Sequence, residues 1–85
     1  MMWNGMIVYG ETFSPDEQSE AWNAWEPWKG WLTLGARLSE ARGLSLPSET
    51  AARGADRMLQ RARKAGFASY SGGQWTKHTP DREFR

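Results

Sequence analysis

Four basic side chains recur at helical spacing in the second half of this 85-residue chain. At about 100° per residue, a helix over residues 48–65 places them on one face and small or aliphatic side chains on the opposite face. The basic residues are Arg53, Arg57, Arg61 and Lys64, and the apolar residues are Ala51, Ala55, Met58, Leu59, Ala62 and Ala65. Like charges at this spacing repel one another on an isolated helix, so a bound polyanion would explain them. We expect this basic face to be accessible to solvent.

Charge is divided unevenly along the chain, although the net charge is only +1. Residues 1–31 carry five acidic side chains and one lysine, whereas residues 32–85 carry ten basic and five acidic side chains. Such asymmetry favours a polyanionic partner for the basic half. The alternative is that the basic residues form a solvated helix face without a partner.

Two further helices are expected before the basic one. Ser14-Pro15-Asp16-Glu17 is typical of a helix start, with a serine cap, a proline in the first turn and acids near the positive end of the dipole. It predicts a helix over residues 15–25. From Pro27, apolar side chains keep helical spacing up to Gly43, and we expect a break near Thr33, with Thr33 as a second cap.

The basic helix is expected to begin at a serine cap, either Ser45 or Ser48, and to end at Gly66. The residues that follow alternate β-prone and polar types around Ser71-Gly72-Gly73-Gln74. This pattern predicts a hairpin over residues 67–78 with glycines at its tip.

A short β-prone run near the start, Met6-Ile7-Val8-Tyr9, ends at Gly10 and is too short to be stable alone. We expect it to pair with the hairpin at 67–78 in a three-stranded sheet. The predicted fold class is therefore mainly α with a small antiparallel β-sheet: three helices and a C-terminal hairpin. A chain this short supports one core, so we expect one domain over residues 1–78 and a flexible tail at 79–85.

Several classes of protein are not expected from the composition. The chain has no cysteine and one histidine, His78, so we expect no disulfide and no metal site. We find no serine–histidine–acid set, phosphate-binding glycine loop or dinucleotide fingerprint, so we expect neither an enzyme nor a cofactor. No apolar run approaches a membrane span and no signal-peptide pattern is evident, so we expect a cytoplasmic protein without membrane contact.

Six tryptophans are available to a small core. Those at 22, 25, 28 and 31 are spaced by three residues, which drifts about 60° per step and prevents one helical stripe from holding all four. We expect core positions for them. Alternatively, surplus tryptophans in the acidic N-terminal half bind a protein partner or a second copy. A contiguous exposed aromatic patch would favour this protein-interaction module, and complete burial would favour a nucleic-acid partner.

A longer pattern begins with Ala36-Arg37-Leu38-Ser39-Glu40-Ala41-Arg42-Gly43-Leu44-Ser45. It continues with Thr50, Arg53, Met58-Leu59, Ala65-Gly66-Phe67 and Gly72-Gly73-Gln74-Trp75. Over residues 32–78 this pattern resembles the winged helix-turn-helix of bacterial and phage DNA-binding proteins. The connection before Thr50 departs from the family's pattern, because it carries Pro47 and is slightly longer.

The resemblance implies a small transcriptional regulator or phage accessory factor that binds double-stranded DNA. The helix that opens at Ser48 would lie in the major groove. Arg53 and Arg57 would contact guanine bidentately, and Thr50 and Gln60 would be weaker base contacts.

The same resemblance implies a wing over residues 70–77. Gly72 and Gly73 would let its tip approach the DNA backbone or minor groove, where Gln74 could donate a hydrogen bond; the alternative is that the glycines serve a tight turn alone. The expected phosphate contacts are Arg37, Arg61, Lys64 and Lys77.

Overall fold

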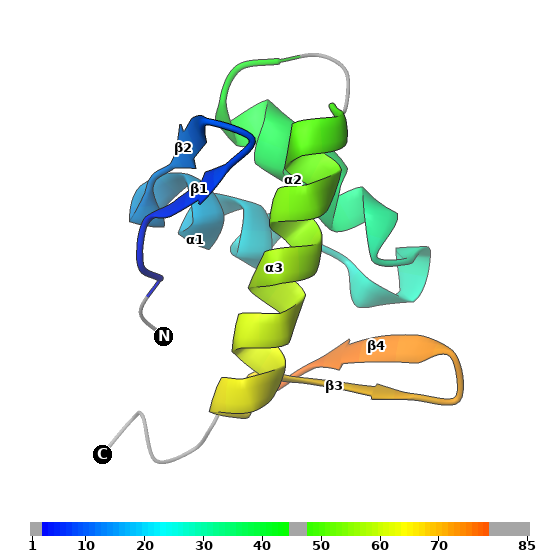
Figure 1. Cartoon of the computed structure of the whole chain (residues 1–85). Coiled ribbons are helices and arrows are strands. Elements are labelled where there is room, and N and C mark those ends of the chain that lie inside the picture. Colours follow the sequence, from blue (N-terminus) through cyan, green and yellow to red (C-terminus); the bar gives the residue numbers. More distant parts are fainter. Residues whose placement is uncertain (1–2, 45–47, 79–85) are drawn as a thin grey trace.

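The computed structural model describes residues 3–44 and 48–78, which form three α-helices, a short 3-10 helix and two antiparallel hairpins (Figure 1). The elements are β1 (Met6–Val8), β2 (Glu11–Phe13), α1 (Pro15–Ala24), η1 (Pro27–Lys29), α2 (Leu32–Ala41), α3 (Glu49–Ala65), β3 (Ala68–Ser71) and β4 (Gln74–Lys77). The expected fold class is confirmed. The predicted tail at 79–85 lies outside the described residues.

The N-terminal hairpin corrects the predicted three-stranded sheet. β1 pairs with β2, in the register Met6↔Phe13, and the two hairpins are separate two-stranded sheets. A two-residue turn, Tyr9-Gly10, joins the strands with positive φ at both residues (50° and 79°). This turn allows strands that are adjacent in sequence to pair, which costs less loop-closure entropy than pairing with the distant hairpin. A left-handed conformation costs a non-glycine residue such as Tyr9 about 1–2 kcal/mol.

α1 begins at the predicted cap. The Ser14 hydroxyl accepts a hydrogen bond from the Glu17 amide at 3.1 Å, and the Glu17 carboxylate accepts one from the Ser14 amide at 2.9 Å. This reciprocal pair satisfies two amides that a helix start leaves without partners. The helix ends at Ala24, one residue before the predicted end.

The segment from Pro27 is divided into η1 and α2, so the expected break is present but lies before Thr33. Gly30 ends η1 with φ 98°, and α2 begins at Leu32. The expected cap at Thr33 is wrong: its hydroxyl lies 2.6 Å from the Gly30 carbonyl oxygen and donates to it instead of accepting from a helix amide. The break therefore falls at the glycine, where positive φ has no steric cost.

α3 has the predicted boundaries. The Ser48 hydroxyl caps its start by accepting from the Ala51 amide at 3.0 Å, and Ser45, the alternative cap, lies outside the described residues. Gly66 ends the helix in the left-handed conformation (φ 86°, ψ 13°). The Phe67 amide then donates to the Ala62 carbonyl at 2.8 Å, which directs the chain into β3.

The core lies where α1, α2 and the N-terminal hairpin meet the apolar face of α3. Two glycines allow the close approach. A Cβ on Gly35 would lie 3.2 Å from the Ala52 Cα atom, and one on Gly54 would lie 2.9 Å from the Leu38 Cδ2 atom. The largest fully buried side chains are Trp25, Phe13, Leu34, Leu38, Met58, Leu59, Gln18 and Ser39.

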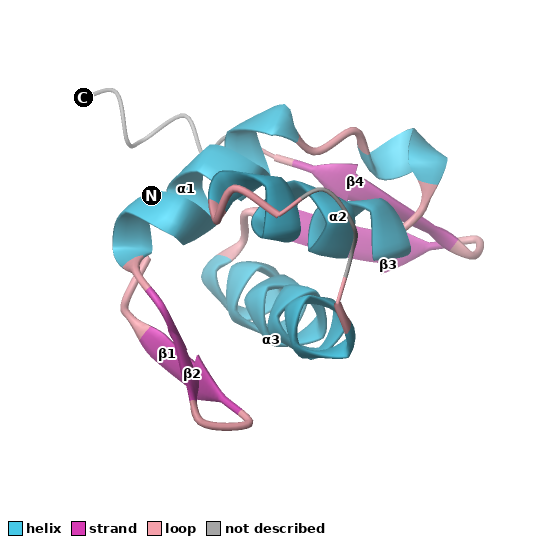
Figure 2. Ribbon diagram, turned by 90° about the horizontal axis from the view of Figure 1, so that it is seen from above, coloured by secondary structure: helices cyan, strands magenta, loops and turns pink. Residues whose placement is uncertain are grey.

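Arg42 ties the N-terminal hairpin to the helices. Its guanidinium pairs with Glu11 on β2 at 2.9 Å and with Glu17 on α1 at 3.2 Å, and it lies 4.0 Å from the centre of the Phe13 ring. The buried Gln18 adds a second link, because its side-chain amide donates to the Asn4 carbonyl at 2.7 Å. The hairpin is thus held at a defined position beside α3 (Figure 2).

Candidate nucleic-acid interface

The outer face of α3 is the side turned away from α1 and α2 (Figure 2). Its exposed polar residues are Glu49, Arg53, Asp56, Arg57, Gln60, Arg63 and Lys64. Within residues 3–44 and 48–78, no acidic side chain forms an ion pair with a basic residue of α3. The face therefore carries four positive and two negative groups that are not paired within the described part of the chain.

The predicted basic residues do not share one environment. Arg53 and Lys64 are exposed. Arg57 is also exposed, and its Nη1 donates to the Ile7 carbonyl oxygen at 2.8 Å. Arg61 is half-buried and donates from Nη1 to the Asn4 carbonyl oxygen at 3.1 Å. Arg57 and Arg61 therefore hold the segment around β1 against α3. Because Arg61 is engaged in this way, its side chain can reach a ligand only over a limited distance.

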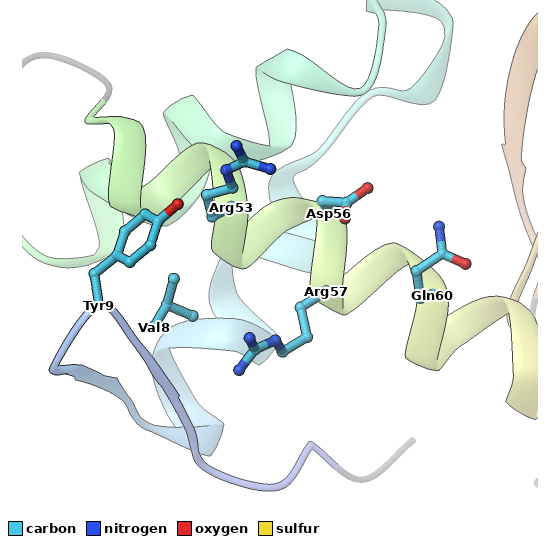
Figure 3. A pocket seen from close by; sticks show the side chains of 6 residues that line it. All are labelled: Val8, Tyr9, Arg53, Asp56, Arg57 and Gln60. Carbon is cyan, nitrogen blue, oxygen red and sulfur yellow. The ribbon is translucent and has the colours of Figure 1, made fainter.

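A cleft of about 400 Å³ lies between the tip of the N-terminal hairpin and α3 (Figure 3). It brings together three residues that were predicted from the sequence to contact DNA and three that were not. The lining residues are Val8, Tyr9, Arg53, Asp56, Arg57 and Gln60. In Figure 3 the guanidinium of Arg57 points back toward the hairpin, whereas Asp56 and Gln60 lie further along α3. The cleft thus has a cationic end beside Tyr9 and a mixed polar end.

Ser48 and Thr50 are placed at the start of α3. Ser48 is half-buried, and its hydroxyl is engaged as the helix cap. Thr50 is also half-buried, and by helical spacing it faces the hairpin side. Neither lines the cleft, so a base contact from either residue stays a prediction.

The predicted wing residues form a different site. Gly72 and Gly73 make a two-residue turn between the paired Ser71 and Gln74, with φ values of 59° and 78°. Two consecutive positive φ angles are the requirement that glycine meets at least cost, so the tight-turn role is confirmed. These glycines and Gln74 are exposed and line a hollow against η1, away from the cleft on α3.

Lys77 is folded onto α1 rather than extended from the hairpin. Its Nζ donates to the Trp22 carbonyl oxygen at 2.9 Å and lies 6.0 Å from the centre of the Trp22 ring. Burial lowers the pKa of Lys77 below its ordinary 10.5, and the nearby charge of Glu26 opposes that shift. The ammonium therefore satisfies a carbonyl at the end of α1, where a positive charge also suits the helix dipole.

Arg37 on α2 is paired with two acidic side chains. It pairs with Glu40 at 3.0 Å and with Glu26 at 3.8 Å. A phosphate contact from Arg37 would have to compete with both carboxylates.

The tryptophans divide into two groups. Trp3, Trp22 and Trp25 are buried, so core positions are confirmed for Trp22 and Trp25. The same expectation is wrong for Trp28 on η1, which is 66% exposed, and for Trp31 just before α2, which is 39% exposed.

Trp28, Trp31, Tyr70 and Trp75 line one hollow of about 220 Å³ between η1 and the C-terminal hairpin. We call these four residues the aromatic surface. The rings of Tyr70 and Trp75 lie 5.1 Å apart, and Trp75 is half-buried against the core. This surface is made by elements other than α3.

Among residues 3–44 and 48–78, no cluster of histidine, cysteine or acidic side chains could hold a metal ion. His78 is exposed, and its Nε2 lies 2.7 Å from the Ser69 hydroxyl. None of the helices described here is both long enough and apolar enough to cross a bilayer.

The chain matches no protein-family model, no curated protein and no solved structure.

Proposed function

We propose that this protein binds duplex DNA as a winged helix-turn-helix, with α2 and α3 as the helix pair and β3–β4 as the wing. The observation that carries the proposal is the outer face of α3, where Arg53, Arg57, Arg63 and Lys64 are exposed and form no ion pair with an acid of the described residues. A row of cations on an accessible helix suits the phosphates that border a major groove.

Polar side chains between these cations support contact with base edges. Arg53 and Arg57 have the forked geometry that guanine accepts, and Gln60 can pair with adenine. Asp56 lines the same cleft and can accept from the amino group of cytosine. An acid on this face would weaken a purely nonspecific contact, so its presence supports a degree of sequence choice.

The order of elements supports the same proposal. A short helix, a connection, a long amphipathic helix and a tight hairpin follow one another from Leu32 to Lys77. A DNA-binding domain of this size would serve as a small transcriptional regulator or a phage accessory factor acting in the cytoplasm.

The test is a titration of the protein with a short mixed-sequence duplex at about 50 mM and about 200 mM salt. We expect tighter binding at low salt. The variant Arg53→Ala/Lys64→Ala should bind at least about 10-fold more weakly at low salt. Its slope of log affinity against log salt should be smaller by about 0.9 for each phosphate contact removed.

A control is Lys29→Ala, which removes a positive charge from η1, where the side chain pairs with Glu26. Its affinity should equal that of the wild-type protein. Absence of binding at low salt, or a loss of affinity in Lys29→Ala as large as that in Arg53→Ala/Lys64→Ala, would contradict the proposal.

A second candidate function is a protein–protein contact through the aromatic surface. Exposed tryptophans that gather in one patch are typical of interfaces, and Trp28 and Trp31 meet that description. Because the aromatic surface and α3 are separate, both functions could be served by one molecule.

Sedimentation of the wild-type protein and of Trp28→Ser/Trp31→Ser over a range of concentrations tests this second candidate with a second copy as partner. A dimer that the double variant abolishes would support it. A monomer at all concentrations would exclude self-association through this surface.

A further inference from the structure

The tip of the N-terminal hairpin lies on the same side of α3 as the proposed DNA contacts. In Figure 2 this hairpin projects past α3 on the side opposite the C-terminal hairpin. α3 is therefore flanked by two hairpins, β1–β2 near its first half and β3–β4 at its end. A helix seated in a groove with a hairpin on each side can meet both bordering strands.

Tyr9 occupies the tip in a way that hairpin stability alone does not explain. It is 66% exposed and adopts φ 50°, a region that glycine or asparagine enters at lower cost. A large side chain with a polar end, held in a strained turn and displayed to solvent, is the arrangement expected of a contact residue. Figure 3 shows its ring at the cleft, above Val8.

The cationic end of the cleft supplies the chemistry of a ligand. Arg53 and Arg57 line it together with Tyr9, and the bond from Arg57 Nη1 to Ile7 fixes that guanidinium beside the hairpin. A guanidinium has five N–H donors, so a single carbonyl leaves Arg57 further donors for a second acceptor. Two arginines and a phenol hydroxyl suit a phosphate oxygen, whereas Asp56 lies at the other end.

We propose that the N-terminal hairpin is a second DNA-contacting arm, in which Tyr9 donates a hydrogen bond to a backbone phosphate held by Arg53 and Arg57 at the cationic end of the cleft. This inference rests on the proposed function, because it assigns a phosphate site beside the same helix. It adds a contact on the side of α3 that the wing does not reach.

The test compares four variants with the wild-type protein in titrations with the same mixed-sequence duplex at low salt. Tyr9→Asn removes the ring and suits the turn, so it should unfold at the same or a higher temperature. It should nevertheless bind about 3- to 10-fold more weakly. Tyr9→Phe, which keeps the ring and loses the hydroxyl, should also bind more weakly.

The matched control is Ile7→Thr. Ile7 is exposed between the buried Met6 and Val8, so its side chain points away from α3 on the same hairpin. Its replacement should leave affinity unchanged. Because tyrosine carries no charge, both Tyr9 variants should keep the wild-type salt slope, whereas Arg53→Ala should lower it by about 1.

The outcomes separate this inference from the function on which it rests. If the wild-type protein binds the duplex and Tyr9→Asn binds equally well, the second arm is wrong and the DNA-binding proposal stands. A loss of equal size in Ile7→Thr would also overturn the phosphate contact, because it would show a general effect of the hairpin. If the wild-type protein fails to bind duplex at low salt, both proposals fall.

Discussion

Arg57 donates from Nη1 to the backbone carbonyl of Ile7 at 2.8 Å, across 50 residues of sequence. The bond gives this arginine a structural role within the face on which DNA binding is proposed. Arg61 makes the equivalent bond to Asn4 one helical turn later. The N-terminal hairpin and the charges of α3 are therefore linked, so changes at Arg57 should affect both stability and binding.

Replacement by alanine should lower the free energy of unfolding at Arg57 but not at Arg53. Arg57→Ala removes a charged donor from the Ile7 carbonyl, so the free energy of unfolding should fall by about 1 kcal/mol. Arg53→Ala removes a side chain without a hydrogen bond among the described contacts and should leave stability unchanged. Urea unfolding measures both values. Equal stability of the two variants would mean that the Ile7 bond contributes nothing.

Asp56 should limit the affinity for DNA while adding to its selectivity. Asp56→Asn removes a negative charge from the cleft that Arg53 and Arg57 also line, and it should raise affinity for a mixed-sequence duplex about 2- to 5-fold at low salt. Competition between duplexes of different sequence should show weaker discrimination, because the acceptor for a base amino group is reduced. A variant that binds more weakly than the wild-type protein would show that Asp56 has a different role.

The caps were predictable because their determinants are local. Ser14 with Glu17, Ser48 with Ala51, and Gly66 after α3 all act within four residues of one another, so the order of residues defines the contacts. The Gly72-Gly73 turn is equally local. These features were enough to predict the boundaries of α1, α3 and the C-terminal hairpin closely.

The cleft was not predictable because the residues that line it are far apart in the sequence. Its lining combines Tyr9 with residues about 45 to 50 positions later, and the three-residue strand Glu11–Phe13 has too weak a pattern to indicate its partner. Tyr9-Gly10 also lacks the Asn-Gly or Asp-Gly signature of a tight hairpin. Likewise, the outward turn of Trp28 depends on the 3-10 geometry of η1, which the spacing of apolar residues does not encode.

Two glycines at the α2–α3 contact should respond differently to alanine. Gly35→Ala should destabilise the protein by about 1–2 kcal/mol despite its better helix propensity, because the new Cβ would meet the backbone of Ala52 at 3.2 Å. Gly54→Ala meets the ends of Leu38 and Met6, which can turn aside, so its stability should stay within about 0.5 kcal/mol of wild type. Thermal unfolding of both variants distinguishes a backbone contact from a side-chain contact. A larger loss in Gly54→Ala would contradict this assignment.

Lys77 should make the stability depend on alkaline pH. Burial against α1 lowers its pKa in the folded state, so between that pKa and 10.5 the unfolded chain binds more protons at Lys77 than the folded chain does. The contribution of Lys77 to the free energy of unfolding should therefore rise with pH as 10.5 is approached from below, and stay flat near neutral pH. The measurement is the difference in unfolding free energy between the wild-type protein and Lys77→Met across this range, in which other titrating groups cancel. The control is Lys77→Arg, which keeps its charge throughout this range, so the difference in unfolding free energy between Lys77→Arg and Lys77→Met should not change with pH. If the difference between the wild-type protein and Lys77→Met is equally independent of pH, the Lys77 ammonium is not desolvated against Trp22.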